Sequence, residues 1–132
     1  CEDECSDRLA RLAAGLRLLS TRDRSLVRVI VVSVDPDRDT PASMADYVKR
    51  FQAEMIGAAA KPEDLKSFAE SFAATYRKMP VAPDGTYQVD HNRPIYLVSA
   101  AGHFVSALNE SLTPEEIAQA LRAKLPALLP PS

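Results

Sequence analysis

A short run of β-branched residues constrains the fold of this chain more than any other feature. The segment Val27 to Val34 has the sequence VRVIVVSV, which is the pattern of a strand that is buried on both faces. Strands of this kind belong to parallel or mixed sheets with helices on either side. The rest of the chain must therefore supply helices and further strands around this one.

Amphipathic helices are predicted on both sides of that strand. Leucine and alanine recur at spacings of three and four between Asp7 and Ser20, which predicts a first helix. Thr40 is a candidate N-cap for a second helix that begins at Pro41; its inward face should consist of Met44, Tyr47, Val48 and Phe51. A third helix, from Pro62, should bury Leu65, Phe68, Ala69, Phe72 and Tyr76.

Further strand and turn patterns occur in the rest of the chain. Met55 to Ala59 is a candidate short strand, and Met79 to Gly85, with two prolines and a glycine, is a loop or an irregular hairpin. Ile95 to Ser99 and Phe104 to Leu108 predict a hairpin whose bend is supplied by Gly102. This alternation of helices and strands indicates an α/β layer fold.

One domain is expected. Thr113 and Pro114 predict the start of a final helix, which should stop before Pro126. We therefore expect a single domain over residues 1–126, followed by a disordered tail over 127–132.

The overall charge and hydropathy argue against some partners. The 132 residues carry a formal net charge of -2, so there is no broad basic field to favour nucleic acid. No apolar run approaches the roughly 20 residues that cross a bilayer, and the charged opening segment is unlike a signal peptide. Any membrane anchor is expected upstream of this chain.

Two cysteines, Cys1 and Cys5, are separated by three residues. If this turn is helical, positions i and i+4 face the same side, so the two sulfurs could share a metal or form a disulfide. The spacing alone leaves a functional pair and two unrelated cysteines equally open, and a lipid-modified Cys1 is a further alternative.

His91, which follows Asp90 and precedes the strand expected from about Pro94, is a candidate third ligand. Two thiolates and one imidazole suit copper, whereas a structural zinc site normally has four protein ligands. Alternatively, His91 is a surface residue without a ligand role. His103 lies in a predicted turn and is expected to face solvent.

The acids Glu2, Asp3 and Glu4 lie between the cysteines. A helix N-terminus lowers the pKa of a thiol, but neighbouring carboxylates oppose that shift. Strong dithiol oxidants need a stabilised thiolate, so the spacer argues against that role while attracting a cation. The alternative is that these acids are simply solvated at a helix start.

Four motifs together resemble those of the Sco/SenC family. They are C-x-x-x-C before a helix, S-V-D-P-D-R-D-T-P at 33–41, Y-R-K at 76–78, and V-D-H at 89–91 followed by I-Y-L-V. The resemblance covers nearly the whole chain in the right order. It implies a thioredoxin-like α/β fold with a mixed central sheet flanked by helices. The family places an N-terminal hairpin and a first central strand before the first cysteine, and these are expected to be lacking here.

The same resemblance implies a set of site residues. Cys1, Cys5 and His91 match the ligands of one copper ion, as Cu(I) or Cu(II). Asp35 matches an acid near the site whose role is indirect. Asp90 is expected to orient the segment that carries His91.

The resemblance also implies a function. Family members assist assembly of the binuclear copper centre in subunit II of cytochrome c oxidase, so the expected role is a copper metallochaperone for that partner or another copper-handling protein. The expected location is the bacterial periplasm, anchored to the inner membrane, or alternatively the mitochondrial intermembrane space. Two other functions stay open: a thioredoxin- or peroxiredoxin-like thiol-disulfide oxidoreductase with Cys1 and Cys5 as its redox-active pair, and a copper or redox sensor.

Overall fold

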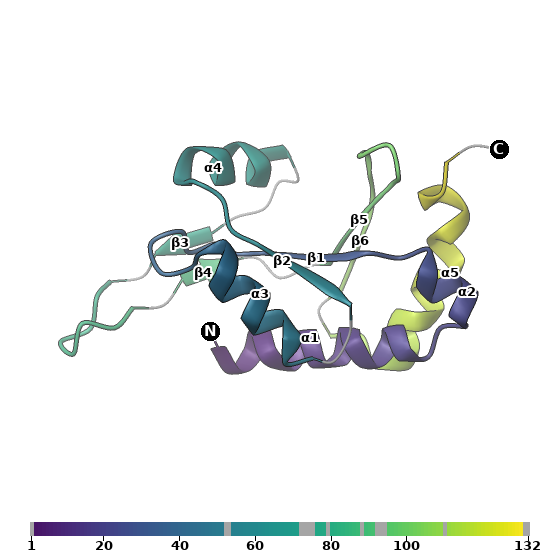
Figure 1. Ribbon diagram of the computed structural model, residues 1–132, viewed down its shortest axis with the longest axis horizontal. Helices are drawn as coiled ribbons and strands as arrows, with labels where there is room; N and C mark the ends of the chain where they lie inside the picture. The colour runs from purple at the N-terminus through teal and green to yellow at the C-terminus, as the bar shows by residue number, and fades with distance from the viewer. Residues whose placement is uncertain are drawn as a thin grey trace. The chain divides into compact units, whose positions relative to one another are not determined.

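The computed structural model describes residues 2–51, 54–71, 76–78, 80–87, 89–91, 95–109 and 111–130. Figure 1 shows its helices and strands, which in chain order are α1 (Glu2–Arg17), α2 (Thr21–Ser25), β1 (Val29–Val32), α3 (Pro41–Lys49), β2 (Met55–Ala58), α4 (Pro62–Ser71), β3 (Tyr76–Lys78), β4 (Val89–His91), β5 (Ile95–Val98), β6 (Phe104–Leu108) and α5 (Pro114–Leu128). The chain divides into two compact units, one formed by Cys1–Glu4 with Val29–Asn92 and the other by Cys5–Arg28 with Arg93–Ser132.

The first unit is built around a parallel pair of strands, β1 and β2. Helix α3 packs on β2 at Gly57, where a Cβ atom would lie 2.9 Å from the Cβ of Met44 and closer still to the Met44 carbonyl group. Only a glycine permits this approach of helix backbone to strand. Met44 and Val48 are buried, as predicted for the inward face of this helix. Tyr47 and Phe51, predicted for the same face, are only half-buried, and Phe51 lies beyond the end of α3 at Lys49.

The prediction that the first strand is buried on both faces is wrong. Ile30 in β1 is 59% exposed, and its cross-strand neighbour Ile56 in β2 is 48% exposed. Because successive side chains of a strand alternate between faces, Ile56 points away from the face on which Gly57 meets α3. Ile30 and Ile56 are cross-strand neighbours, so both lie on the face opposite to α3.

Helix α3 begins where the sequence predicted. The Thr40 hydroxyl accepts a hydrogen bond from the Ser43 amide at 3.1 Å, and the Thr40 amide donates to the Ser43 hydroxyl at 2.9 Å. This capping box gives the backbone amides of Thr40 and Ser43 a hydrogen-bond acceptor each. It therefore fixes the end of the loop that leads into α3.

The third predicted helix is shorter than expected. Leu65 and Ala69 are buried in α4, but Phe68 is 49% exposed, so the buried stripe is narrower than the apolar pattern suggested. The described part of the helix runs to Ser71, and Tyr76 lies in β3 instead, because pairing with another strand overrides its helical spacing. Phe72 lies outside the described residues.

An antiparallel ladder that was not predicted joins β3 to β4. Tyr76 lies opposite His91, Arg77 opposite Asp90, and Lys78 opposite Val89. The Y-R-K and V-D-H motifs are therefore cross-strand partners. His91 lies within a strand of its own, not in a segment that merely precedes one. The loop predicted around residues 79–85 is confirmed over residues 80–85.

The second unit contains α1, α2, α5 and the hairpin of β5 and β6. At Gly15 of α1, a Cβ atom would lie 2.9 Å from the Cγ2 of Ile117 and 3.0 Å from the Pro114 carbonyl oxygen of α5, and Figure 1 shows these helices close together. The strands β5 and β6 pair antiparallel, and Gly102 has a φ of 87° at their turn, as predicted. The buried apolar residues are Leu12, Ala13, Leu16, Leu19, Leu97, Leu108, Ile117, Ala118, Leu121 and Leu125.

The final helix passes through the proline that was expected to end it. It begins after Thr113, as predicted, with a capping box between Thr113 and Glu116, but α5 continues through Pro126 to Leu128. A proline in the last turn removes only one backbone donor, and the Ala100 amide donates to the Leu128 carbonyl at 2.8 Å, which holds that turn. Residues 127 and 128 of the expected tail are thus helical, while 131 and 132 lie outside the described residues.

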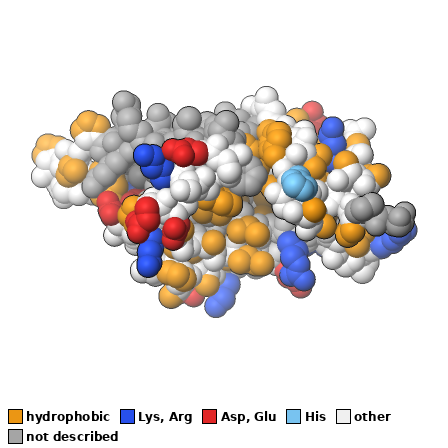
Figure 2. Space-filling view, turned by 90° about the horizontal axis from the view of Figure 1, so that it is seen from above, with side chains coloured by type: hydrophobic (Ala, Val, Ile, Leu, Met, Phe, Trp, Pro, Cys, Tyr) orange, Lys and Arg blue, Asp and Glu red, His pale blue; other side chains and the backbone are white. Residues whose placement is uncertain are grey.

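The surface combines apolar and charged side chains. Figure 2 shows hydrophobic side chains interspersed with acidic and basic ones on one face. Across the described ranges, none of the helices combines the length and apolarity that crossing a bilayer requires.

The contact at Gly57 generates a stability prediction. Gly57→Ala should lower the free energy of unfolding by at least about 2 kcal/mol, because the new methyl group meets the Met44 backbone, which cannot rotate away. Ile56→Thr, on the outward face of the same strand, should change it by less than about 1 kcal/mol. Denaturant unfolding of both variants checks this, and an equally stable Gly57→Ala variant would contradict the packing of α3 on β2.

Candidate metal centre

The loop between β1 and α3 is held by a set of short-range hydrogen bonds. The Ser33 hydroxyl accepts from the Asp35 amide at 3.0 Å and donates to the Asp39 carboxylate. The amides of Arg38 and Asp39 donate to the Asp35 carbonyl at 3.2 and 3.0 Å. These bonds fold the S-V-D-P-D-R-D-T-P motif into a turn, with Asp35 at its inner side.

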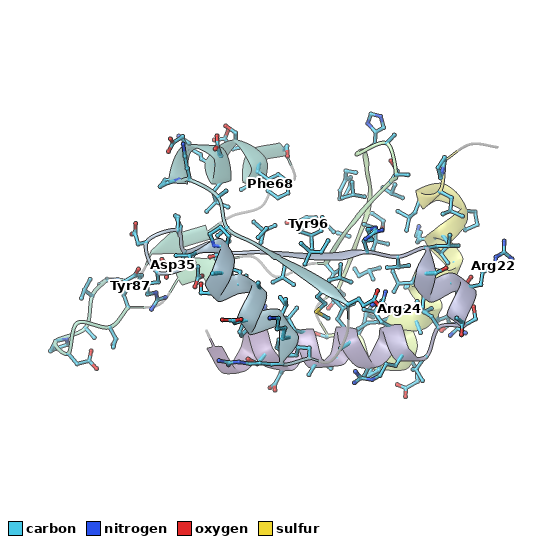
Figure 3. The ribbon with its side chains drawn as sticks, in the orientation of Figure 1. Arg22, Arg24, Asp35, Phe68, Tyr87 and Tyr96 are labelled. Atoms are coloured by element: carbon cyan, nitrogen blue, oxygen red, sulfur yellow. The ribbon has the colours of Figure 1, made fainter. Side chains whose placement is uncertain are left out.

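Asp35 is the buried acid of this loop, with only 7% of its surface exposed. One carboxylate oxygen, Oδ1, accepts from the Tyr87 hydroxyl at 2.9 Å, and the other, Oδ2, accepts from the Arg38 Nε. A buried carboxylate is costly unless it is paired and hydrogen-bonded. Both requirements are met here, and Figure 3 shows Asp35 and Tyr87 close to one another.

Arg38 holds Tyr87 in two further ways. Its Nη1 donates to the Tyr87 backbone carbonyl at 2.9 Å, and its guanidinium carbon lies 4.0 Å from the centroid of the Tyr87 ring. Partial desolvation lowers the pKa of Arg38, but its hydrogen bond and charge interaction with Asp35 raise that pKa overall. The guanidinium therefore keeps its charge in this contact.

The segment before Tyr87 is a tight turn. The Asp84 carboxylate accepts from the Thr86 hydroxyl at 2.6 Å and from the Thr86 amide at 3.0 Å, and these bonds lower the pKa of Asp84. Gly85 has a φ of 87°, the left-handed conformation that favours glycine. This turn positions Tyr87 next to the loop that contains Asp35.

The structure locates the predicted donors only in part. Cys5 lies in the first turn of α1, and His91 is the last residue of β4. Asp90 precedes His91, opposite Arg77. Cys1 lies outside the described residues, and the side chains of Cys5, Asp90 and His91 are not among the described ones. Cys5 belongs to one compact unit, and Asp35 and His91 belong to the other.

No cluster of three or more His, Cys, Asp or Glu side chains suited to a metal occurs within the described part of the chain. His103, which was predicted to face solvent, is exposed in the turn between β5 and β6, where its amide donates to the Ser99 hydroxyl at 3.1 Å.

Sequence reasoning missed two residues, Arg38 and Tyr87. Arg38 lies inside the S-V-D-P-D-R-D-T-P motif, so the motif contained a signal for it. Tyr87 is separated from Asp35 by 52 positions, and nothing in the local pattern around it indicates that contact.

Comparison with protein families and curated proteins gives consistent matches. A SCO1/SenC family model matches residues 1–126 of the chain. The mitochondrial protein SCO2 homolog of Danio rerio is 35% identical over 124 residues, which are 92% of this chain and 44% of that protein. The mitochondrial protein SCO1 homolog 1 of Arabidopsis thaliana is 38% identical over 105 residues, or 80% of this chain and 31% of that protein. The chain thus spans less than half the length of these relatives.

Two solved structures have a similar fold. ScoI from Bradyrhizobium japonicum with copper bound is 36% identical, with a TM-score of 0.81 over 93% of this chain and 77% of that one. ScoI from Arabidopsis thaliana with copper bound is 30% identical, with a TM-score of 0.83 over 96% and 78%. The predicted α/β, thioredoxin-like class is confirmed by these similarities.

The contact between Tyr87 and Asp35 generates a pH prediction. Desolvation and the hydrogen bond to the Asp35 carboxylate raise the pKa of Tyr87 above its ordinary value of about 10. The stability that this contact contributes is therefore fully present below pH ~10 and is lost as the pH rises through the folded-state pKa. Tyr87→Phe has no such group, so the free energy of unfolding should fall more steeply with alkaline pH in the parent than in the variant. Parallel curves from denaturant unfolding would contradict the contact.

Proposed function

Because the chain belongs to the SCO1/SenC family, we propose that it is a metallochaperone that carries one copper ion as its cargo. The ligands are the thiolates of Cys1 and Cys5 and the imidazole of His91. The observation that carries this proposal is that the family match runs over residues 1–126 and so includes all three donors. Two relatives of this chain, each at least 30% identical, have been solved with copper bound.

The chemistry of the donor set fits copper. Thiolate ligands select soft ions such as Cu(I), and imidazole also suits copper. Helix α1 begins at Glu2, so Cys5 lies in its first turn, four positions after Cys1. Two residues at this spacing share one side when both are helical, and the spacing therefore supports a shared ion.

The acidic spacer favours a cation over a reactive anion. Glu2, Asp3 and Glu4 add negative charge within a few residues of both cysteines. This charge opposes a further anion, the free thiolate, and attracts the positively charged cargo.

Asp90 is proposed as a positioning residue for the histidine. In the register of β3 and β4 it lies opposite Arg77, and opposite charges at such positions stabilise an antiparallel pair. The pairing supports a role for Asp90 in holding β4 in place, next to His91.

The proposed recipient is the binuclear copper centre in subunit II of cytochrome c oxidase or another copper-handling protein. The proposed location is the bacterial periplasm, with an inner-membrane anchor, and one similar solved structure is of a bacterial protein, ScoI from Bradyrhizobium japonicum. The mitochondrial intermembrane space is the alternative, supported by the mitochondrial relatives.

A thiol-disulfide oxidoreductase is the second candidate, favoured by the position of Cys5. A cysteine in the first turn of a helix is close to the positive end of the helix dipole, which stabilises a thiolate. Such an enzyme needs the cysteine pair but has no use for His91, so the two candidates differ in their dependence on that residue.

The ligand set generates the first functional prediction. Cys1→Ser, Cys5→Ser and His91→Ala should each weaken copper binding by more than about 100-fold, because losing a direct ligand exceeds the usual effect of losing a group that orients one. His103→Ala, in the exposed turn, is the matched control and should bind like the parent. Anaerobic titration against a chromophoric copper(I) chelator measures this. Unchanged binding by His91→Ala would instead favour the oxidoreductase.

A second prediction concerns the redox state of the cysteines. Copper needs two thiolates and a disulfide offers none, so oxidation of the pair should abolish copper binding and a thiol reductant should restore it. Metal analysis after gel filtration of the oxidised and the re-reduced protein checks this. Equal copper content in both samples would place the ion elsewhere.

A further inference from the structure

Asp35, Arg38 and Tyr87 form a cluster that joins the loop after β1 to the chain entering β4; we call this cluster the latch. We propose that the latch is a positioning device that fixes the backbone of His91 for copper. The inference rests on the proposed function, because it concerns the same metal site.

The latch holds Tyr87 through three different parts of that residue. Its hydroxyl donates to Asp35 at 2.9 Å, its carbonyl accepts from Arg38 at 2.9 Å, and its ring lies under the Arg38 guanidinium at 4.0 Å. Side chain and backbone are therefore restrained together. His91 follows Tyr87 by four positions, and β4 begins at Val89, two positions after Tyr87. A displacement of Tyr87 therefore acts close to the strand that carries His91.

The other end of the latch is attached to the β1–β2 pair. The Ser33 amide donates to the Ala58 carbonyl of β2 at 2.9 Å, and the Ser33 hydroxyl accepts from the Asp35 amide at 3.0 Å. The Asp35 carbonyl in turn accepts from the amides of Arg38 and Asp39. The latch thus connects β4 to the packed part of its unit.

The strand that carries His91 needs such a connection. Among the described residues the ladder between β3 and β4 spans three residue pairs, and a short two-stranded hairpin is marginal by itself in water. The restraint that the latch places on Tyr87, just before β4, therefore contributes strongly to the position of the strand.

The contacts of Asp35 favour positioning over direct ligation. Oδ1 and Oδ2 each accept a hydrogen bond, from Tyr87 and Arg38, and the residue is buried. A carboxylate with both oxygens engaged orients its neighbours, in the way that outer groups orient metal ligands.

The first test uses the copper-free protein and so does not depend on metal. Tyr87→Phe removes the hydroxyl and keeps the ring under Arg38. The matched control is Ser71→Ala, which removes an exposed hydroxyl that donates to the Phe68 carbonyl in α4 of the same unit, outside the latch. Amide hydrogen exchange at Val89 to His91 should become about tenfold faster in Tyr87→Phe and stay as in the parent in Ser71→Ala.

The second test follows copper. Tyr87→Phe should weaken copper(I) binding about tenfold in an anaerobic chelator competition and alter the electron paramagnetic resonance spectrum of the copper(II) form. Arg38→Lys keeps the positive charge but loses the planar guanidinium with its several N–H donors, so it should also weaken copper(I) binding. In a His91→Ala background the Tyr87→Phe change should add no further loss, because the latch acts through His91.

The outcomes separate the inference from the proposed function. Parental exchange and affinity in Tyr87→Phe would overturn the latch, and so would an equal loss of affinity with and without His91, which would make its role merely structural. A parent that binds no copper would overturn the proposed function and the copper role of the latch with it, whereas the exchange rates would still show whether the latch holds β4.

Discussion

The buried carboxylate of Asp35 is the constraint on which the arrangement of the described site depends. A carboxylate removed from water needs a donor for each oxygen and a counter-charge nearby. One donor, Arg38, comes from the same loop, but the other comes from Tyr87, far along the chain. Because the Asp35 carboxylate needs a donor for each oxygen, its hydrogen bonds bring the segment before β4 onto the loop after β1.

The loop that contains Asp35 is held between two closely packed elements, β2 and α3. Gly57 lets α3 approach β2 without an intervening side chain, and the capping box of Thr40 and Ser43 then fixes where α3 begins. The loop that contains Asp35 runs between β1 and that helix start, so its two ends are set by the core. Gly15 has the equivalent role where α1 meets Ile117 of α5.

The proposed copper donors lie on elements that differ in their own stability. Cys5 belongs to a helix of 16 residues, which satisfies most of its backbone groups internally. His91 belongs to β4, of which the structure describes three residues; β4 pairs with β3, and Asp35 and Arg38 contact Tyr87 shortly before it. The strand is therefore the element whose position the rest of the fold must secure if the chain is to carry a metal.

The sequence by itself determined the local structure and the candidate donors. The caps at Thr40 and Thr113 and the turn at Gly102 were predictable because their interactions act within a few residues, and motif order indicated Cys1, Cys5 and His91. Only the tertiary structure decided the outward position of Ile30, the pairing of β3 with β4, and the contact of Tyr87 with Asp35. These depend on which segments meet in space, and a hydrogen bond is governed by the distance between its atoms and not by their separation along the chain.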